Sequence, residues 1–314
     1  MSPKALHARF LALSPAASGA LWMTLAACLL ATLSLLVRSI SGDLHPFEIA
    51  FFRNVAQLVL MLPWVWMAGI AVIRTTRTWA HVRRSAFGIG AMLTWFSVLT
   101  MMPIAEATAI SFSAPLFTTA GAALFLREQV GVRRWLATVV GFAGVLLIIR
   151  PGFHEVGQPQ LLALLAAALI AGAMLSNKSL AKTEPPNAMV VWMGVYMSIF
   201  SLPPALTVWT WPEADVWIWL VVLGFVATAA HLAINRAFGA ADASFIAPFG
   251  FVQIPFVAAI GFIAYAEVPD LWTWAGSAVI VASGIYIARR EAKHRQAVAV
   301  QPALGVATLG VEKV

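Results

Sequence analysis

The sequence predicts an all-α polytopic membrane protein, with ten transmembrane helices arranged as two inverted five-helix repeats around a central cavity. Three observations lead to this prediction: an apolar composition, ten apolar segments of membrane-spanning length, and a similarity between the two halves. Of the 314 residues, 61% are hydrophobic and 11% are charged. A soluble domain carries about a quarter charged residues, so this composition excludes an ordinary water-exposed surface.

Ten segments resemble spanning helices, which need about 20 mostly apolar residues. They are 18–38, 47–68, 84–102, 105–126, 132–150, 159–179, 188–209, 215–236, 243–265 and 271–289. The connections 101–106, 127–131 and 267–270 are short. Short connections place consecutive helices antiparallel, so the chain is expected to cross the membrane back and forth.

The basic residues predict the orientation. If the N-terminus is cytoplasmic, every Lys and Arg lies on the cytoplasmic side except Arg38 and Arg150, which lie outside, and Arg53, which lies within a span. Cytoplasmic loops are enriched in Lys and Arg. Both termini are therefore predicted to be cytoplasmic, in the inner (plasma) membrane. The net charge of +7 then reflects topology and requires no nucleic-acid partner.

The two halves of the chain match each other at a shift near 140 residues. At a shift of 139, Glu128 corresponds to Glu267 and Trp135 to Trp274. Each copy holds five spans, so the second copy must enter the membrane from the opposite side. Inverted repeats allow a midplane site to open to either face, which favours a secondary transporter.

The stretch 107–152 carries features of a known family: a Pro-containing fourth span closed by Glu128, and Gly141 and Gly144 in the fifth. Residues 240–290 repeat these features more weakly, and Phe51-Phe52-Arg53-Asn54 in the second span is also typical. The chain thus resembles the EamA-type branch of the drug/metabolite transporter superfamily. The resemblance implies a ten-helix carrier that exports small metabolites. Within the superfamily, the Trp-rich, charge-poor spans are most similar to the YddG-type amino-acid exporters.

Four regions are expected along the chain. They are a cytoplasmic N-terminus (1–17), a first EamA-type repeat (18–150), a second, inverted repeat (159–290) and a cytoplasmic tail (291–314). The tail is polar and rich in small residues, and chain ends of this kind are poorly ordered unless they are tied down. We therefore expect it to be disordered.

Polar residues inside spans are the first candidates for substrate binding, because they are costly in lipid. Arg53 is interpreted as a carboxylate clamp, with a helix–helix latch and a snorkelling side chain as alternatives. Trp95 and His231 correspond at a shift of 136, each beyond a pair of small residues on one helix face. We hypothesise that they face a shared cavity, where Trp95 stacks on substrate and His231 offers a hydrogen bond. Ordinary core packing is the alternative.

The remaining candidates are weaker. Ser111, Asn177 and Gln253 can hydrogen-bond a zwitterion or merely join helices, and Trp22 and Trp192 lie deeper than the interfacial Trp residues. Pro115, Pro248 and Pro255 are interpreted as hinges, because a proline inside a helix frees a carbonyl and kinks the chain. The alternative is that prolines are simply commoner in spanning helices.

The predicted function is export of small metabolites, favouring neutral or aromatic amino acids, by alternating access. No acidic residue lies in the middle of a predicted span, which indicates facilitated diffusion or exchange, with His231 the only plausible proton carrier. Another metabolite, a drug-like or nucleotide-like compound, and a passive channel are the alternatives. The sequence has no nucleophile–base motif, metal cluster or phosphate-binding glycine loop. No enzyme activity, metal or cofactor is therefore predicted, and the expected partners are a small molecule and the lipid bilayer.

Overall fold

The structure, a computed structural model, describes residues 15–125, 132–150, 157–180, 183–240, 249–286 and 289, and all statements below refer to these. This part of the chain is helical, without strands. The first half contains α2 (Pro15–Ile40), α3 (Pro46–Ala68), the 3-10 helix η1 (Ile70–Ile73), α4 (Thr78–Met101), α5 (Ile104–Ser111), α6 (Ala114–Phe125) and α7 (Val132–Ile149). The second half contains α8 (Gln158–Leu180), α9 (Pro186–Leu206), α10 (Ala214–Ala240), α12 (Gln253–Tyr265) and the helix Leu271–Tyr286.

The helices match the predicted membrane architecture. Counting the consecutive short helices α5 and α6 as one crossing, the described elements correspond to the ten predicted spans. Of these, α2, α3, α8, α9 and α10 are long and apolar enough to cross a membrane by length and composition alone. Large apolar side chains such as Leu161, Val221 and Phe225 are exposed on the outer surface. A broad apolar exterior of this kind suits a lipid environment. The prediction of an all-α polytopic membrane fold is confirmed.

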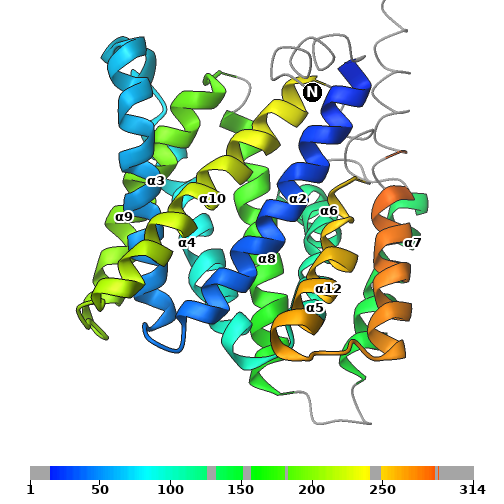
Figure 1. Ribbon diagram of the computed structural model, residues 1–314. Coiled ribbons are helices and arrows are strands. Elements are labelled where there is room, and N and C mark those ends of the chain that lie inside the picture. The colour runs from blue at the N-terminus through cyan, green and yellow to red at the C-terminus, as the bar shows by residue number, and fades with distance from the viewer. Residues whose placement is uncertain are drawn as a thin grey trace, which may run out of the picture.

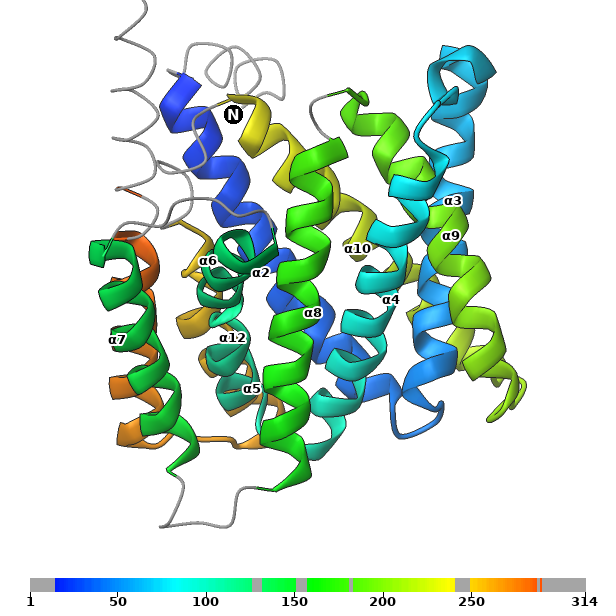
Figure 2. The same cartoon turned by 180° about the vertical axis from the view of Figure 1, so that it is seen from behind.

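The two halves are inverted relative to each other. In Figure 1, α2 starts at the top beside the N mark and descends, whereas α8, the first helix of the second half, starts at the bottom and ascends; Figure 2 shows the same from behind. The contacts between helices are consistent with this inversion. The contact of α2 with α10 corresponds to that of α8 with α4, and the contact of α2 with α12 corresponds to that of α8 with α6. These contacts between the halves thus form symmetry-related pairs, as inverted repeats require.

The last helix of each half repeats this relationship residue by residue. Gly144 of α7 lies against Gly276 of Leu271–Tyr286, and Ser283 donates a hydrogen bond to the Ala137 carbonyl. Adding the sequence shift of 139 to Ala137 and Gly144 gives 276 and 283. The two contacts are therefore equivalent under the internal repeat.

Three of the differences from the predicted helix limits concern candidate site residues. The segment 105–126 is not one helix, because Phe112 and Ser113 form a turn between α5 and α6. Pro115 consequently lies in the first turn of α6, where a proline breaks no helical hydrogen bond. Of the segment 243–265, α12 starts at Gln253, which puts Pro255 in the first turn as well. Pro248 lies outside the described residues. Finally, α4 begins at Thr78 rather than at residue 84.

Candidate functional site

A cluster of buried polar side chains lies on α3. The Arg53 side chain is 2% exposed, and its Nη1 donates to Asn54 Oδ1 at 2.8 Å, while its Nε has no hydrogen-bond partner. Asn54 donates in turn to the Met197 carbonyl and to Ser201 Oγ, both at 3.5 Å. One turn further, Gln57 is 1% exposed and neither of its polar atoms has a partner.

Helix α4 contributes a second guanidinium. Nε and Nη1 of Arg84 are buried without hydrogen-bond partners, as is the neighbouring Ser85 hydroxyl. The charge of Arg84 acts on Arg53, and both act on His231 of α10. We call Arg53, Gln57, Arg84 and His231 the cationic cluster.

In the part of the chain that the structure describes, the cationic cluster has no counter-ion. Within the described residues, the ion pairs join other side chains, and no carboxylate pairs with Arg53 or Arg84. Leaving a buried charge uncompensated is costly. Guanidinium groups bind carboxylates and phosphates in two-pronged geometry. The arrangement can therefore receive a negatively charged group together with water.

Trp95 and His231 were expected to share a cavity. The structure places Trp95 half-buried between two apolar clusters, whereas His231 belongs to the cationic cluster. The small residue below each one packs against a helix of the other half. A β-carbon on Gly88 would lie 3.5 Å from Met197 Sδ, and one on Gly224 would lie 2.4 Å from the Ala56 β-carbon. The shared cavity stays a prediction.

The other candidates are dispersed. Ser111 donates to the Thr108 carbonyl of its own helix at 2.7 Å, and Oδ1 of Asn177 is buried without a partner. The Arg236 guanidinium lies 4.7 Å from the centre of the Trp22 ring. Gln253 is the first residue of α12. The structure thus groups only Arg53 and His231 among the predicted binding residues.

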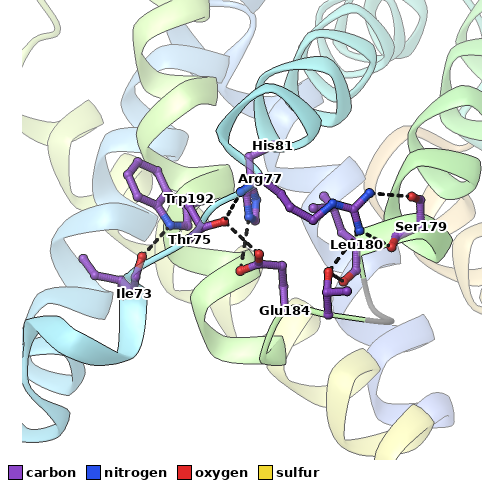
Figure 3. Close-up of polar contacts among 9 residues, drawn as sticks. Ile73, Thr75, Arg77, His81, Ser179, Leu180, Glu184 and Trp192 are labelled. Carbon is purple, nitrogen blue, oxygen red and sulfur yellow. Dashed lines mark hydrogen bonds and ion pairs between the residues drawn. The ribbon is translucent and has the colours of Figure 1, made fainter.

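Trp192 belongs to a different group (Figure 3), at the end of the molecule where α9 begins (Figure 1). Its indole nitrogen donates to the Ile73 carbonyl at 2.8 Å, and its ring lies 6.0 Å from that of His81. Glu184, between α8 and α9, accepts from Thr75 Oγ1 at 2.7 Å and lies 3.6 Å from His81 Nε2. We call Thr75, His81, Glu184 and Trp192 the Glu184 clasp.

Beside the Glu184 clasp, Arg77 donates to the carbonyl and hydroxyl of Ser179 and to Thr183 Oγ1. Arg77 therefore ties the start of α4 to the end of α8. Together with the clasp, it joins the two halves at this end of the molecule.

Sequence reasoning missed Arg84 and His81. Arg84 was counted among the cytoplasmic basic residues at the start of the predicted span 84–102, and His81, which precedes that span, was given no role. The available signal was their spacing, because His81, Arg84 and Ser85 stand at i, i+3 and i+4, on one face of a helix. That face continues to Gly88 and Trp95.

At the opposite end, the two arginines predicted outside each pair with an acidic residue of one connection. Arg38 pairs with Glu267 at 2.6 Å, and Glu267 Oε2 also accepts from the Ile104 backbone at 3.0 Å. Arg150 pairs with Asp270. Burial raises the pKa of Asp270, but hydrogen bonds from Thr273 and the charge of Arg150 outweigh it, so this pKa lies below its usual value.

The described residues contain no group of three or more His, Cys, Asp or Glu that could hold a metal ion. The candidate site is therefore described by its cationic and polar side chains alone.

The chain is similar to known proteins over most of its length. The model of the EamA-like transporter family matches it twice, at residues 17–150 and 159–289. A solved crystal structure superimposes with a TM-score of 0.62 at 20% identity, over 87% of this chain and 97% of the other. The two chains therefore share a fold.

Curated relatives cover most of the chain as well. A riboflavin transporter of Vibrio cholerae is 32% identical over 88% of this chain and 94% of its own. An S-adenosylmethionine uptake transporter of Rickettsia felis is 31% identical over 80% of this chain and 85% of its own. A pseudopaline exporter of Pseudomonas aeruginosa is 26% identical over 87% of this chain and 96% of its own.

Proposed function

Because the chain belongs to the EamA-like transporter family, we propose that it carries a small metabolite with a carboxylate group and a planar ring across the inner membrane. The carboxylate binds at Arg53 and Arg84, and the carrier works by alternating access with both termini in the cytoplasm. The observation that supports this most is that Nε of Arg53 and both Nε and Nη1 of Arg84 are buried without a hydrogen-bond partner.

The names of the relatives narrow the substrate class. They name S-adenosylmethionine, riboflavin and pseudopaline as cargo of those proteins, and none of the three is a YddG-type amino-acid exporter by name. S-adenosylmethionine combines an aminocarboxylate with an adenine ring, and an aromatic amino acid combines the same group with a smaller ring. We therefore propose zwitterions with a ring, among which aromatic amino acids are the simplest members.

In this proposal, the substrate moves down its own concentration gradient. Uptake and export both occur among the names of the relatives, and a facilitated carrier or exchanger runs either way. Export, as expected from the resemblance, is then a matter of which side holds more substrate.

Proteoliposomes test the proposal. We expect saturable uptake of radiolabelled S-adenosylmethionine or tryptophan, reduced about tenfold or more by Arg53→Gln or Arg84→Gln, since charge-assisted hydrogen bonds contribute about 1.5–3 kcal/mol. Arg83→Gln is the matched control, because Arg83 is the exposed neighbour of Arg84 on α4. Flux that rises linearly with concentration would indicate a pore. If Arg83→Gln lost as much flux as Arg53→Gln and Arg84→Gln, the proposed role of the cationic cluster in binding would be contradicted.

A further inference from the structure

The Glu184 clasp has a counterpart at the other end of the molecule. There Glu48, in the first turn of α3, is fully buried and accepts from Thr210 N at 2.7 Å and from Thr210 Oγ1 at 3.2 Å. Beside it, the Phe52 ring lies 5.2 Å from the Trp217 ring. We call these four residues the Glu48 clasp. In both clasps a carboxylate accepts from a threonine and an aromatic pair lies alongside.

The aromatic pairs correspond through the internal repeat. Phe52 and Trp192 are 140 residues apart, the shift at which Pro46 and Pro186 begin α3 and α9. His81 and Trp217 are 136 residues apart, the shift that relates Gly88 to Gly224. His81 therefore stands where the other clasp has an indole. Of the two clasps, only the Glu184 clasp contains a histidine, the side chain whose ordinary pKa lies near neutral pH.

The surroundings of His81 make its protonation sensitive to nearby charge. The side chain is 1% exposed, and neither ring nitrogen has a hydrogen-bond partner. Burial opposes a positive charge on the ring, Glu184 favours it, and Arg84 and Arg77 oppose it. Glu184 is itself only 6% exposed. A proton on His81 creates an ion pair across the clasp, between α4 and the α8–α9 connection.

We propose that His81 and Glu184 form a proton-binding site that holds this end of the carrier closed, and that a substrate carboxylate at Arg53 and Arg84 promotes its protonation. The proton comes from water at this end and resides on the imidazole, with Nε2–H directed at Glu184. Opening separates the pair and returns the proton to the same water. The coupling to substrate rests on the proposed function, whereas the proton site itself does not.

Coupling follows from the order of the groups on α4. Arg84 is one turn beyond His81 on the same face, so an anion bound to Arg84 offsets the charge that opposes protonation. By reciprocity, a proton on His81 strengthens binding of the anion by the same factor. In this proposal the pH at the His81 end controls this step, because the Glu48 clasp contains no histidine.

Histidine NMR of the purified full chain tests the proton site without substrate. With ¹⁵N-labelled histidine, the signal lost in His81→Gln identifies His81 among the six histidines. We expect it to titrate, with a midpoint lowered by Glu184→Gln and raised by Arg84→Gln. Glu48→Gln is the matched control and leaves the midpoint unchanged. A His81 signal that ignores Glu184→Gln would overturn the proton site.

Transport in oriented proteoliposomes tests the coupling, with S-adenosylmethionine and tryptophan as probes. We expect KM to fall about fivefold or more, the lower limit of usual coupling factors, when the pH at the His81 end drops from about 7 to about 5, because a buried histidine gains its proton below the usual range of histidine titration. His81→Gln removes this dependence while flux persists, and changing the pH at the other end has no effect. Melting temperatures check that His81→Gln is folded, and His81→Phe provides a second variant.

The two proposals fail differently. Absence of saturable flux for every probe contradicts the proposed function but leaves the NMR titration intact. Saturable flux with the same pH profile in wild type, His81→Gln and His81→Phe overturns the coupling.

Discussion

Gly144 and Gly276 lie backbone against backbone where α7 meets the last helix of the second half. A β-carbon on Gly144 would lie 2.9 Å from the Gly276 carbonyl oxygen, and one on Gly276 would lie 2.6 Å from the Gly144 carbonyl oxygen. Small residues of this kind let membrane helices approach closely. The two halves are therefore fastened together at their final helices, away from the cationic cluster.

Substitution of Gly276 by Ala is expected to lower the stability of the protein. The added methyl group would meet backbone, which cannot rotate away, and overpacking costs about 1–3 kcal/mol. Thermal unfolding followed by size-exclusion fluorescence measures the change in melting temperature. Gly250→Ala is the control, because its nearest neighbour would be Met23 Sδ at 3.9 Å. Equal melting temperatures for Gly276→Ala and wild type would contradict the close contact.

Gly224→Ala and Gly88→Ala are expected to differ, although the two positions correspond in the repeat. The methyl group at 224 would meet the Ala56 β-carbon at 2.4 Å, whereas that at 88 would meet the flexible Met197 at 3.5 Å. Alanine also favours a helix over glycine by about 1 kcal/mol. Gly88→Ala should therefore be neutral or stabilising, and Gly224→Ala destabilising, in the same melting assay. A change of the same sign in the melting temperatures of both variants would contradict this prediction.

Arg53 and Arg84 show how much of the candidate site could be predicted from the sequence. Arg53 was identified because an arginine inside an apolar run is costly and needs a reason. Arg84 follows Arg83 at the edge of a run, where the positive-inside rule explains any arginine. Its inward direction depends on α4 starting six residues earlier and on packing against α8 and α9. These contacts join segments that are far apart in the chain, so they cannot be predicted from sequence periodicity.

The prolines and His81 illustrate the same limit. Pro115 was expected to kink a long helix, but the turn at Phe112 and Ser113 leaves it in a first turn instead. A role for His81 could be inferred only from its contact with Glu184, which is about 100 residues away along the chain. By contrast, the fold class depends on composition and on the repeat, which are properties of the sequence itself, so it was predictable.

Glu267→Gln is expected to open the end of the molecule opposite to the Glu184 clasp. The substitution removes the ion pair with Arg38 and weakens the hydrogen bond from the Ile104 backbone. Ile40, close to Arg38 at the end of α2, is 3% exposed, so Ile40→Cys serves as a reporter in a Cys28→Ser background. A membrane-impermeant thiol reagent should label it several-fold faster with Glu267→Gln. Asp43→Asn, a nearby charge change outside the ion pair, controls for local electrostatics and should not alter the rate.

Asp270→Asn is expected to lower stability at neutral pH and to have little effect in acid. The pKa of Asp270 is lower when folded than its ordinary value of 3.8. Its carboxylate therefore stabilises the fold at pH values above 3.8, and this contribution is lost as the pH falls through the lower, folded value. Melting temperatures of variant and wild type should differ at pH 7 and converge below the folded value. A difference that persists unchanged in strong acid would exclude the carboxylate as its cause.

Both chain ends are expected in the cytoplasm. The distribution of Lys and Arg in the sequence predicts this orientation, and the two arginines that it places outside, Arg38 and Arg150, pair with Glu267 and Asp270. Fusions of green fluorescent protein should fluoresce at either terminus, and alkaline phosphatase fusions there should be inactive. Ends on different sides of the membrane would contradict an even number of crossings, and with it the inverted repeat.

Arg53→Lys is expected to separate charge from geometry in the cationic cluster. Lysine keeps the positive charge but lacks the planar fork that grips a carboxylate at two points. It also loses the donor that holds Asn54 Oδ1 at 2.8 Å. We expect KM for a carboxylate substrate to rise about tenfold, with a smaller change in kcat, because the lost contact binds substrate throughout the cycle. Arg53→Gln should be worse than Arg53→Lys for carboxylates, and both should be alike for an uncharged ring compound such as riboflavin. If all three proteins transport a carboxylate substrate equally, Arg53 serves packing and the anion binds elsewhere.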